Sequence, residues 1–394
     1  MIYLVIALLL LFLSFRIDIN GKKENQDFWY FFVLVVLICV AGMRYRVGVD
    51  TTGANYRFYH DTPVLSRVFD DMSLLDYPLW TLLNSFVFTI GGKWFWVQLI
   101  QSTFVNVFIF RYFKKHCQYV FTCIFFYFIW LYAAINFEEM KASFAIVLSL
   151  YAYDYILSKK YLKGLVLLCI GCLFHFSAIL VLPLAFMPFL RLNIFGFVLL
   201  FISFVLGHII ATRFEDYLML FGFDDFVEGK VQSYTESDRF FAHEQTGVLF
   251  YMFRIVPLIL YPLVAFWFVK RKNMAQDMLK LEPYLLIGFF MVCIYASIII
   301  FYRYINFYVP IFILFVSQAV VDITKAQPII STGVSVFRTF LLCSLFFLNI
   351  YVVNKDRIDK FYPYSSIIDR KVYESKEKKF SEDRVVPRPR YDEY

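Results

Sequence analysis

Residues 44–50 carry two arginines and an aspartate directly after an apolar run. The guanidinium groups of Arg44 and Arg46 suit phosphate oxygens, because each can donate two parallel hydrogen bonds. Gly48 permits a sharp turn before Asp50. A carboxylate beside arginines stays ionised, so it can orient a sugar hydroxyl or accept its proton. This stretch is a candidate phosphate and sugar site; the alternative is an anchor at the membrane interface, where Arg and Tyr are common.

A second polar group, Asn-Phe-Glu-Glu-Met-Lys, lies at residues 136–141 between two apolar runs. Ionisable side chains this close to membrane-length apolar runs are functional candidates. Glu139 is a candidate carboxylate and Lys141 a candidate cation. The alternative is a simple external turn between two helices.

Three further places offer groups for the same chemistry. His175 lies in the middle of an apolar stretch, as a catalytic group or as a packed, hydrogen-bonded residue. Arg303 lies between two tyrosines at the start of another run. Arg254 lies inside a run, from which a long side chain can also extend to the membrane surface. The connection at 213–247 adds Arg239, but its three basic and eight acidic residues do not make it a general anion trap.

Signatures of other chemistries are absent from the sequence. It contains no GxxxxGK[ST], HExxH or GxSxG motif. The pairs Asp70-Asp71 and Asp224-Asp225 are adjacent, and neighbours on a helix do not share a face, so they are weak metal ligands. Cys169 and Cys172 form a CxxC without evident partner ligands. We therefore expect neither a metal nor a cofactor.

The composition indicates that these residues belong to a membrane protein. Hydrophobic residues make up 61% of the 394 positions and charged residues only 18%, against about 45–50% and about 25% in soluble proteins. The net charge of +7 comes from short basic clusters between apolar runs, so we expect no nucleic-acid binding. The fold class that follows is all-α: a polytopic integral membrane protein with about 12 transmembrane helices and external loops.

The order of apolar runs and basic connections predicts a topology. Lys and Arg in short connections favour the cytoplasmic side, which places the N-terminus and every candidate group above on the outer side. The runs cover about residues 1–15, 28–43, 93–112, 119–135, 140–157, 164–177, 178–190, 194–212, 248–269, 283–300, 304–323 and 330–353. The basic connections hold Arg16, Lys22, Lys23, Arg111, Lys114, Lys115, Lys159, Lys160, Lys163, Arg191, Lys270, Arg271, Lys272, Lys280 and Lys325.

Two segments must be short for this topology to hold. Residues 79–91 end at Gly91-Gly92 and are expected to form a re-entrant or interfacial helix on the outer side. Residues 164–190 are expected to form two short helices that meet at an external apex near His175. We divide the chain into a transmembrane helical domain, 1–353, and a tail, 354–394, whose 11 basic and 9 acidic residues predict partial disorder.

Taken together, these segments resemble the EpsG-like branch of the Wzy polysaccharide polymerases over about residues 1–365. Their order and spacing carry the resemblance more than any one motif. Lys141-Ala142 stands where the family usually has Arg-Gln. The ammonium of lysine keeps the positive charge but lacks the bidentate hydrogen-bond geometry of a guanidinium. The matching stretches are 44–50 with Tyr56, 77–84, 136–145, 159–161 leading to 174–178, Arg303 with Tyr308, and Tyr362-Pro363-Tyr364.

The resemblance implies a glycosyltransferase that joins undecaprenyl-diphosphate-linked oligosaccharide repeats on the outer face of the bacterial inner membrane. The lipid diphosphate is the leaving group. Its partners would be the lipid-linked donor and acceptor, membrane lipids, and a chain-length regulator and flippase of the same pathway. The expected roles are catalytic for Asp50, Glu139 and His175; diphosphate-binding for Arg44, Arg46, Lys141, Arg254 and Arg303; and sugar-binding for Tyr45, Tyr56, Arg57, Tyr304 and Arg239.

Three other classes of protein compete with this interpretation. A flippase or transporter of the same lipid-linked sugars would show internal symmetry and charges along a central cavity, whereas here the charges gather on one side. A membrane acyltransferase would need a carboxylate near His175, and none is adjacent in sequence. A non-catalytic scaffold of a polysaccharide export complex would tolerate loss of Arg44.

The topology is tested by cysteine labelling of intact spheroplasts from outside. We predict no labelling at positions 115, 160 and 271, and labelling at positions 50, 139, 234 and 364. Labelling at position 271 but not at 234 would overturn the orientation.

Overall fold

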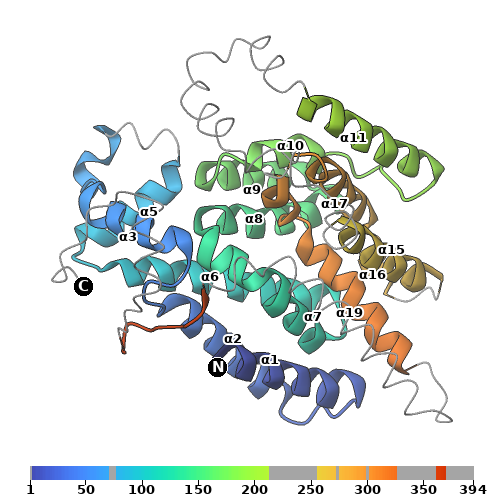
Figure 1. Cartoon of the computed structure of the whole chain (residues 1–394), viewed down its shortest axis with the longest axis horizontal. Coiled ribbons are helices and arrows are strands. Elements are labelled where there is room, and N and C mark those ends of the chain that lie inside the picture. Colours follow the sequence, from blue (N-terminus) through green and yellow to red (C-terminus); the bar gives the residue numbers. More distant parts are fainter. Residues whose placement is uncertain are drawn as a thin grey trace. The chain divides into compact units, whose positions relative to one another are not determined.

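The structure is a computed structural model, and it describes residues 2–70, 77–212, 255–271, 275–298, 301–325 and 361–369. The regular elements of the described residues are helices, and an isolated antiparallel bridge joins Arg44 to Ser366 (Figure 1). The predicted all-α class is therefore confirmed for this part of the chain. The run at 330–353 and the connection at 213–247 lie outside it.

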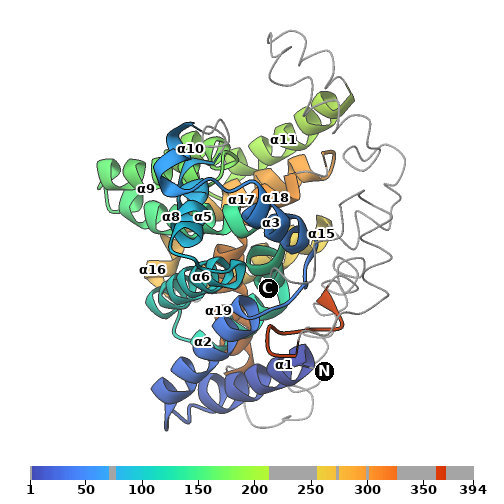
Figure 2. The ribbon, with the colours of Figure 1, turned by 90° about the vertical axis from the view of Figure 1, so that its left-hand side faces the viewer.

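The chain divides into two units, residues 1–182 with 354–394 and residues 183–353. The division assumed from the sequence, a 1–353 domain followed by a tail, stays a prediction. The helices of the first unit, seen from two sides in Figures 1 and 2, are α1 (Ile2–Leu13), η1 (Ser14–Ile19), α2 (Gln26–Gly42), α3 (Val49–His60), η2 (Leu65–Asp70), α5 (Pro78–Thr89), α6 (Trp94–His116), α7 (Val120–Tyr127), η3 (Phe128–Tyr132), η4 (Ala134–Glu138), α8 (Met140–Leu157) and α9 (Tyr161–Phe174), with α10 (Ala178–Ala185) at its boundary.

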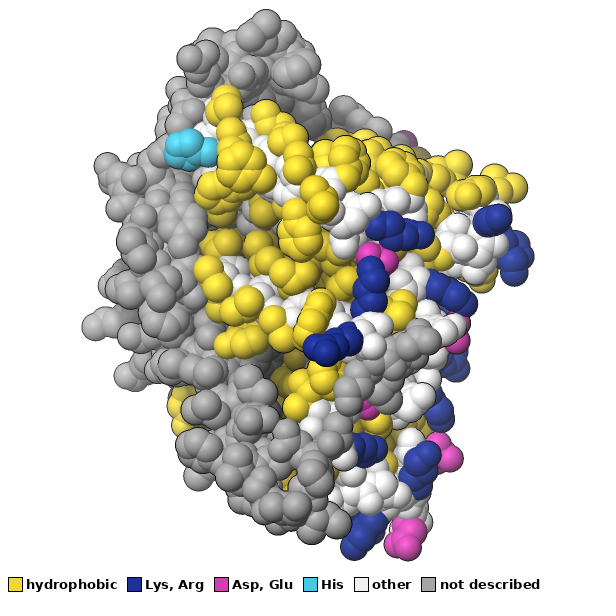
Figure 3. Space-filling view, turned by 90° about the vertical axis from the view of Figure 1, so that its right-hand side faces the viewer, with side chains coloured by type: hydrophobic (Ala, Val, Ile, Leu, Met, Phe, Trp, Pro, Cys, Tyr) yellow, Lys and Arg dark blue, Asp and Glu magenta, His cyan; other side chains and the backbone are white. Residues whose placement is uncertain are grey.

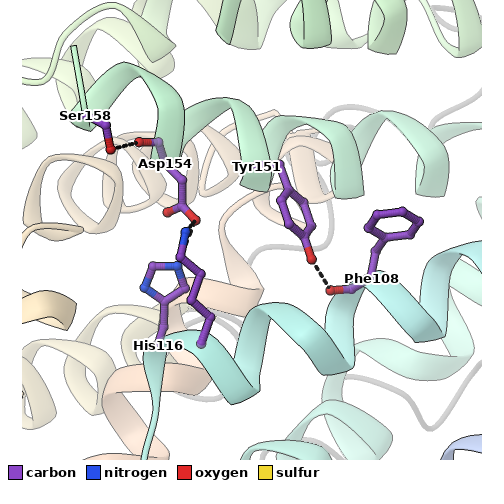
Figure 4. Close-up of polar contacts among 6 residues, drawn as sticks. Phe108, His116, Tyr151, Asp154 and Ser158 are labelled. Atoms are coloured by element: carbon purple, nitrogen blue, oxygen red, sulfur yellow. Dashed lines mark hydrogen bonds and ion pairs between the residues drawn. The ribbon is translucent and has the colours of Figure 1, made fainter. Parts of the chain in front are cut away.

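Basic connections of the first unit come together at one end of its helices. Lys114 Nζ lies 3.3 Å from Asp27 Oδ1, which joins the end of α6 to the start of α2. At the end of α8, Asp154 Oδ2 lies 2.5 Å from Lys115 Nζ and 2.9 Å from His116 Nε2 (Figure 4). Since successive helices reverse direction, the other ends of α2, α6 and α8 share the opposite end of the unit.

That opposite end holds the helices that do not traverse the unit. An apolar cluster joins Phe58 of α3 and Trp80 of α5 to Trp94 of α6 and Phe144 of α8. Helix α5 is the short helix predicted at 79–91, whereas α3 and η2 were not anticipated. The predicted interruption at His175 is also present, because α9 ends at Phe174 and α10 begins at Ala178.

The second unit has its own charged end. Glu282 is buried, and its Oε1 accepts a hydrogen bond from Leu192 N at 2.9 Å. Arg191 and Lys270 approach the same carboxylate at 3.9 and 3.6 Å. Two predicted basic connections, those that hold Arg191 and Lys270, therefore meet here. The helices of this unit are α11 (Ile194–Thr212), α15 (Val256–Arg271), α16 (Gln276–Leu279), α17 (Glu282–Tyr295), α18 (Tyr302–Ile305) and α19 (Val309–Lys325).

The distribution of polar side chains is that of a bundle in lipid. Helix α6 buries Gln98, Gln101 and Asn106 almost completely, while Trp96 on the same helix is 47% exposed. Lipid offers no hydrogen-bond partners, so polar groups turn inward and apolar groups outward. Figure 3 shows broad areas of exposed apolar side chains on one face. The chain is therefore a membrane protein.

The described helices differ in whether their length and hydropathy suffice to cross a membrane. Two described helices, Ile2–Ile19 and Met140–Leu157, are long and apolar enough to cross a membrane. The predicted total of about 12 stays a prediction. Shorter apolar helices cover Gln26–Gly42, Val120–Tyr132, Tyr161–Phe174, Ile194–Ile209 and Glu282–Tyr295.

Residues 361–369 form a C-terminal strap that lies against the N-terminal part of the first unit. Tyr45 N donates to Ser365 O and Ile367 N donates to Met43 O, both at 2.9 Å. The turn that follows is held by Asp369, whose Oδ1 accepts from Ser366 N at 2.6 Å. This backbone hydrogen bond lowers the pKa of the Asp369 carboxyl, so it stays ionised at neutral pH. The strap thus fixes the stretch in which Arg44 lies.

Candidate active site

Arg44 follows the last turn of α2 and turns its side chain into the protein, where it is 1% exposed. Its Nη1 donates to Ala41 O, and its Nη2 lies 2.9 Å from Met140 Sδ. The guanidinium carbon lies 5.0 Å from the centroid of the Phe137 ring. Arg44 therefore links the end of α2 to the junction between η4 and α8.

Tyrosines complete the surroundings of this guanidinium. The hydroxyls of Tyr132 and Tyr364 donate to carbonyl oxygens of α2, Leu37 O at 2.6 Å and Val40 O at 3.2 Å. Tyr3 packs edge-on against Tyr364, with ring centroids 5.9 Å apart. Val40 O and Ala41 O are among the last carbonyls of α2, which lack intrahelical partners, so donors from Tyr364 and Arg44 stabilise this helix end.

The charge of Arg44 has no full counter-charge in the described chain. Arg44 forms no ion pair with a described carboxylate, and its Nε has no hydrogen-bond partner among the described residues. The carbonyl end of α2 supplies only about half a negative charge. Burial lowers the pKa of Arg44 to about 10, so the group remains charged at neutral pH. A buried, undercompensated guanidinium favours an anion.

The junction beside Arg44 is built by a buried network of amides and hydroxyls. Asn106 Nδ2 donates to Asn136 Oδ1 at 2.9 Å, and Asn136 Nδ2 donates to Tyr127 OH at 3.0 Å. Tyr127 OH in turn donates to Asn106 Oδ1 at 2.9 Å. These bonds hold the π-helical segments η3 and η4, a geometry that recurs at functional sites. Asn136 is therefore a buried positioning residue of the predicted second polar group.

The π-helical stretch ends at Glu139, where the backbone leaves helical geometry before α8 begins at Met140. Glu139 is half-buried at this break. Lys141 is the second residue of α8, and its Nζ lies 4.0 Å from the centroid of the Tyr77 ring. The predicted carboxylate and cation therefore flank one helix start.

His175 reaches the same end of the unit through Tyr77. The two rings lie 5.5 Å apart at 30°. His175 Nδ1 lies 2.5 Å from Ser177 Oγ and accepts a hydrogen bond from Ser177 N at 3.2 Å. Because a backbone N–H can only donate, Nδ1 is the acceptor and Nε2 carries the ring proton. His175 can thus act as a hydrogen-bond donor through Nε2.

The stretch after Arg44 leads to the predicted catalytic aspartate. Arg46 adopts a left-handed backbone with φ of 50°, and its guanidinium lies 5.6 Å from the Tyr45 ring centroid. Such a conformation is strained for an arginine and is typical of functional sites. Gly48, with φ of 95°, precedes α3. The backbone of Asp50 lies in the first turn of α3, which contacts η4.

The remaining predicted residues are more dispersed. Tyr45 is buried, Arg57 is exposed on α3, and Tyr56 lies on α3 with its side chain outside the described structure. Arg303 and Tyr304 belong to α18 of the second unit, so the diphosphate-binding role of Arg303 and the sugar-binding role of Tyr304 stay predictions. Arg239 and Arg254 lie outside the described residues.

Two sets of residues at this end were not singled out from the sequence as site residues. Tyr77 stood only in a matching stretch, although the proline that follows it, Pro78, marks a helix start. Asn106 and Tyr127 lie inside apolar runs, and an amide in such a run signals a buried hydrogen-bond network.

This end of the first unit contains positively charged side chains, a carboxylate and a hydrogen-bond donor. Arg44, Arg46 and Lys141 supply positive charge, Glu139 a carboxylate and His175 a hydrogen-bond donor. Among the described residues, no group of three His, Cys, Asp or Glu side chains could hold a metal ion. The arrangement suits stabilisation of a phosphate leaving group by fixed cations and donors.

Comparison with known proteins gives one family. The model of the EpsG family matches residues 27–366, which include every described residue of the site except Tyr3. No curated protein and no solved structure matches the chain.

Replacing Arg44 by Met separates anion binding from a purely structural role. We predict that Arg44→Met raises the stability of the unliganded protein by about 1–4 kcal/mol, because an apolar side chain of similar length removes an undercompensated buried charge. Thermal unfolding in detergent measures this. Arg67→Met, on the exposed part of η2, is the matched control and is expected to change stability by about 0.5 kcal/mol or less. A marked loss of stability in Arg44→Met alone would show that Arg44 is only a structural anchor of α2.

Proposed function

The chain belongs to the EpsG family, and on that premise we propose that it polymerises undecaprenyl-diphosphate-linked oligosaccharide repeats. Membership of the family indicates a general role in polysaccharide polymerisation. The proposal adds the lipid diphosphate substrate, glycosyl transfer as the reaction, and the outer face of the bacterial inner membrane as its place.

The observation that carries the proposal is the buried guanidinium of Arg44 without a described carboxylate partner. In a protein that needed Arg44 only for structure, a neutral donor would satisfy Ala41 O at lower cost, since an unpaired buried charge is destabilising. A diphosphate supplies the missing negative charge and accepts from a guanidinium bidentately. Because Arg44 is 1% exposed, Phe137 or the C-terminal strap must shift before a diphosphate can touch it.

The reaction requires three catalytic contributions from the protein. A hydroxyl of the acceptor repeat attacks the anomeric carbon of the donor chain, and the bond from that carbon to the diphosphate oxygen breaks. The hydroxyl proton passes to a carboxylate, and undecaprenyl diphosphate leaves. Cations stabilise the negative charge that develops on the leaving group, a base accepts the proton, and bound sugars are held in line.

The proposed roles follow the chemistry of the side chains. Asp50 is the preferred base or sugar-orienting carboxylate, because two arginines before it keep it ionised. Glu139 and His175 are the next candidates for this role. Lys141 supplies a point charge beside the Arg44 junction. The diphosphate is assigned to Arg44, Arg46, Lys141, Arg254 and Arg303, and the sugars to Tyr45, Tyr56, Arg57, Tyr304 and Arg239.

A purified assay with lipid-linked repeat tests the function and the base together. We predict that wild type forms polymer and releases undecaprenyl diphosphate, and that Arg44→Ala loses activity by a factor of about 100–1,000. Asp50→Asn keeps hydrogen bonding but cannot accept a proton, so a base role predicts that Asp50→Asn and Asp50→Ala are both inactive.

Other outcomes of this assay point elsewhere. An active Asp50→Asn beside an inactive Asp50→Ala would limit Asp50 to orienting the sugar. Full activity in both variants would remove Asp50 from the site. Transport of the lipid-linked repeat across vesicles without polymer would favour a flippase, and normal polymer in Arg44→Ala would favour a scaffold.

A further inference from the structure

The backbone and the apolar neighbours of Tyr77 restrict its position independently of any charged group. It is the N-cap residue of α5 and is followed by Pro78 at the first helical position, where the proline ring restricts the backbone. Its carbonyl accepts a hydrogen bond from Thr81 N at 2.9 Å. Its side chain packs against the apolar cluster that includes Trp80 and Met140. The ring therefore has little freedom to move.

Lys141 rests on that ring at a place where its own helix does not favour it. Its Nζ lies 4.0 Å from the centroid of Tyr77, well inside the range of about 6 Å for a cation–π contact. Lys141 lies in the first turn of α8, where the helix dipole disfavours a positive charge. A lysine stem also loses rotational entropy when it is held in one place. The aromatic ring supplies an attraction that offsets part of these costs.

The same ring also contacts the predicted histidine. The rings of Tyr77 and His175 lie 5.5 Å apart, and His175 belongs to the break between α9 and α10. Ser177 sets its tautomer through the hydrogen bond to Nδ1, which leaves the proton on Nε2. Tyr77 thus lies between a cation on α8 and a hydrogen-bond donor from another part of the chain.

We infer that Tyr77 is a positioning residue of the diphosphate site, whose ring holds Lys141 in place for binding of the leaving group. This inference rests on the proposed function, because it assumes a polyprenyl diphosphate as the ligand. Tyr77 acts through Lys141. Its aromatic face is the part that matters for this role.

The test measures binding of undecaprenyl diphosphate to the full-length protein in detergent, with undecaprenol as the control for binding of the lipid chain alone. Tyr77→Phe keeps the ring and is expected to bind within about 2-fold of wild type. Tyr77→Leu removes the ring and is expected to weaken binding about 3- to 30-fold. In a Lys141→Met background, Tyr77→Leu should weaken binding no further, because the two residues act as one unit.

Fluorinated phenylalanines at position 77 keep the inference testable if Tyr77→Leu does not fold. They preserve the shape of the ring and withdraw charge from its face, so affinity should fall stepwise from phenylalanine to 4-fluoro- to 3,4,5-trifluorophenylalanine. Equal affinity across this series, or additive losses in the Tyr77 and Lys141 double variant, would overturn the role of Tyr77 while leaving the proposed function intact. Wild type that binds undecaprenyl diphosphate no better than undecaprenol would overturn both.

Discussion

The absence of hydrogen-bond partners in lipid is the constraint on which the rest of the structure depends. Helix α6 carries two glutamines and an asparagine within its apolar sequence, and all three are buried. The ring of bonds among Asn106, Asn136 and Tyr127 satisfies groups that lipid would leave unpaired. That ring fixes the π-helical segments, and the segments set where α8 begins. The position of Lys141 and the packing of Arg44 both follow from it.

The same constraint explains why the chemistry gathers at one end of the first unit. Charged groups at the other end pair with each other, as Asp154 does with Lys115 and His116. Arg44 differs because, within the described part of the chain, its charge faces carbonyls, a sulfur atom and aromatic rings. An ion pair is already neutralised, whereas a buried cation without a full counter-charge favours the binding of an anion. Within one unit, the paired charges at one end therefore serve the structure, and the guanidinium of Arg44 at the other end is assigned to the proposed function.

Sequence was sufficient for those features that depend on local pattern. The run predicted at 140–157 is helix α8, and the break at His175 and the short helix at 79–91 are present. The contacts of Arg44 were not predictable, because Phe137 and the C-terminal strap reach it from distant parts of the chain. Tyr77 was missed as a site residue for the same reason, because its proposed role depends on its contact with Lys141, 64 positions later in the sequence. Helix α3 lacks an apolar run, so hydropathy could not reveal it.

The most direct measurement of the central claim is an experimental structure of the protein with undecaprenyl diphosphate bound. The account predicts phosphate oxygens within hydrogen-bonding distance of the Arg44 guanidinium, with Lys141 nearby, and with Phe137 or the strap at 361–369 displaced from its position in the unliganded protein. A diphosphate bound elsewhere, with Arg44 still enclosed by Phe137, Met140 and the tyrosines, would contradict it.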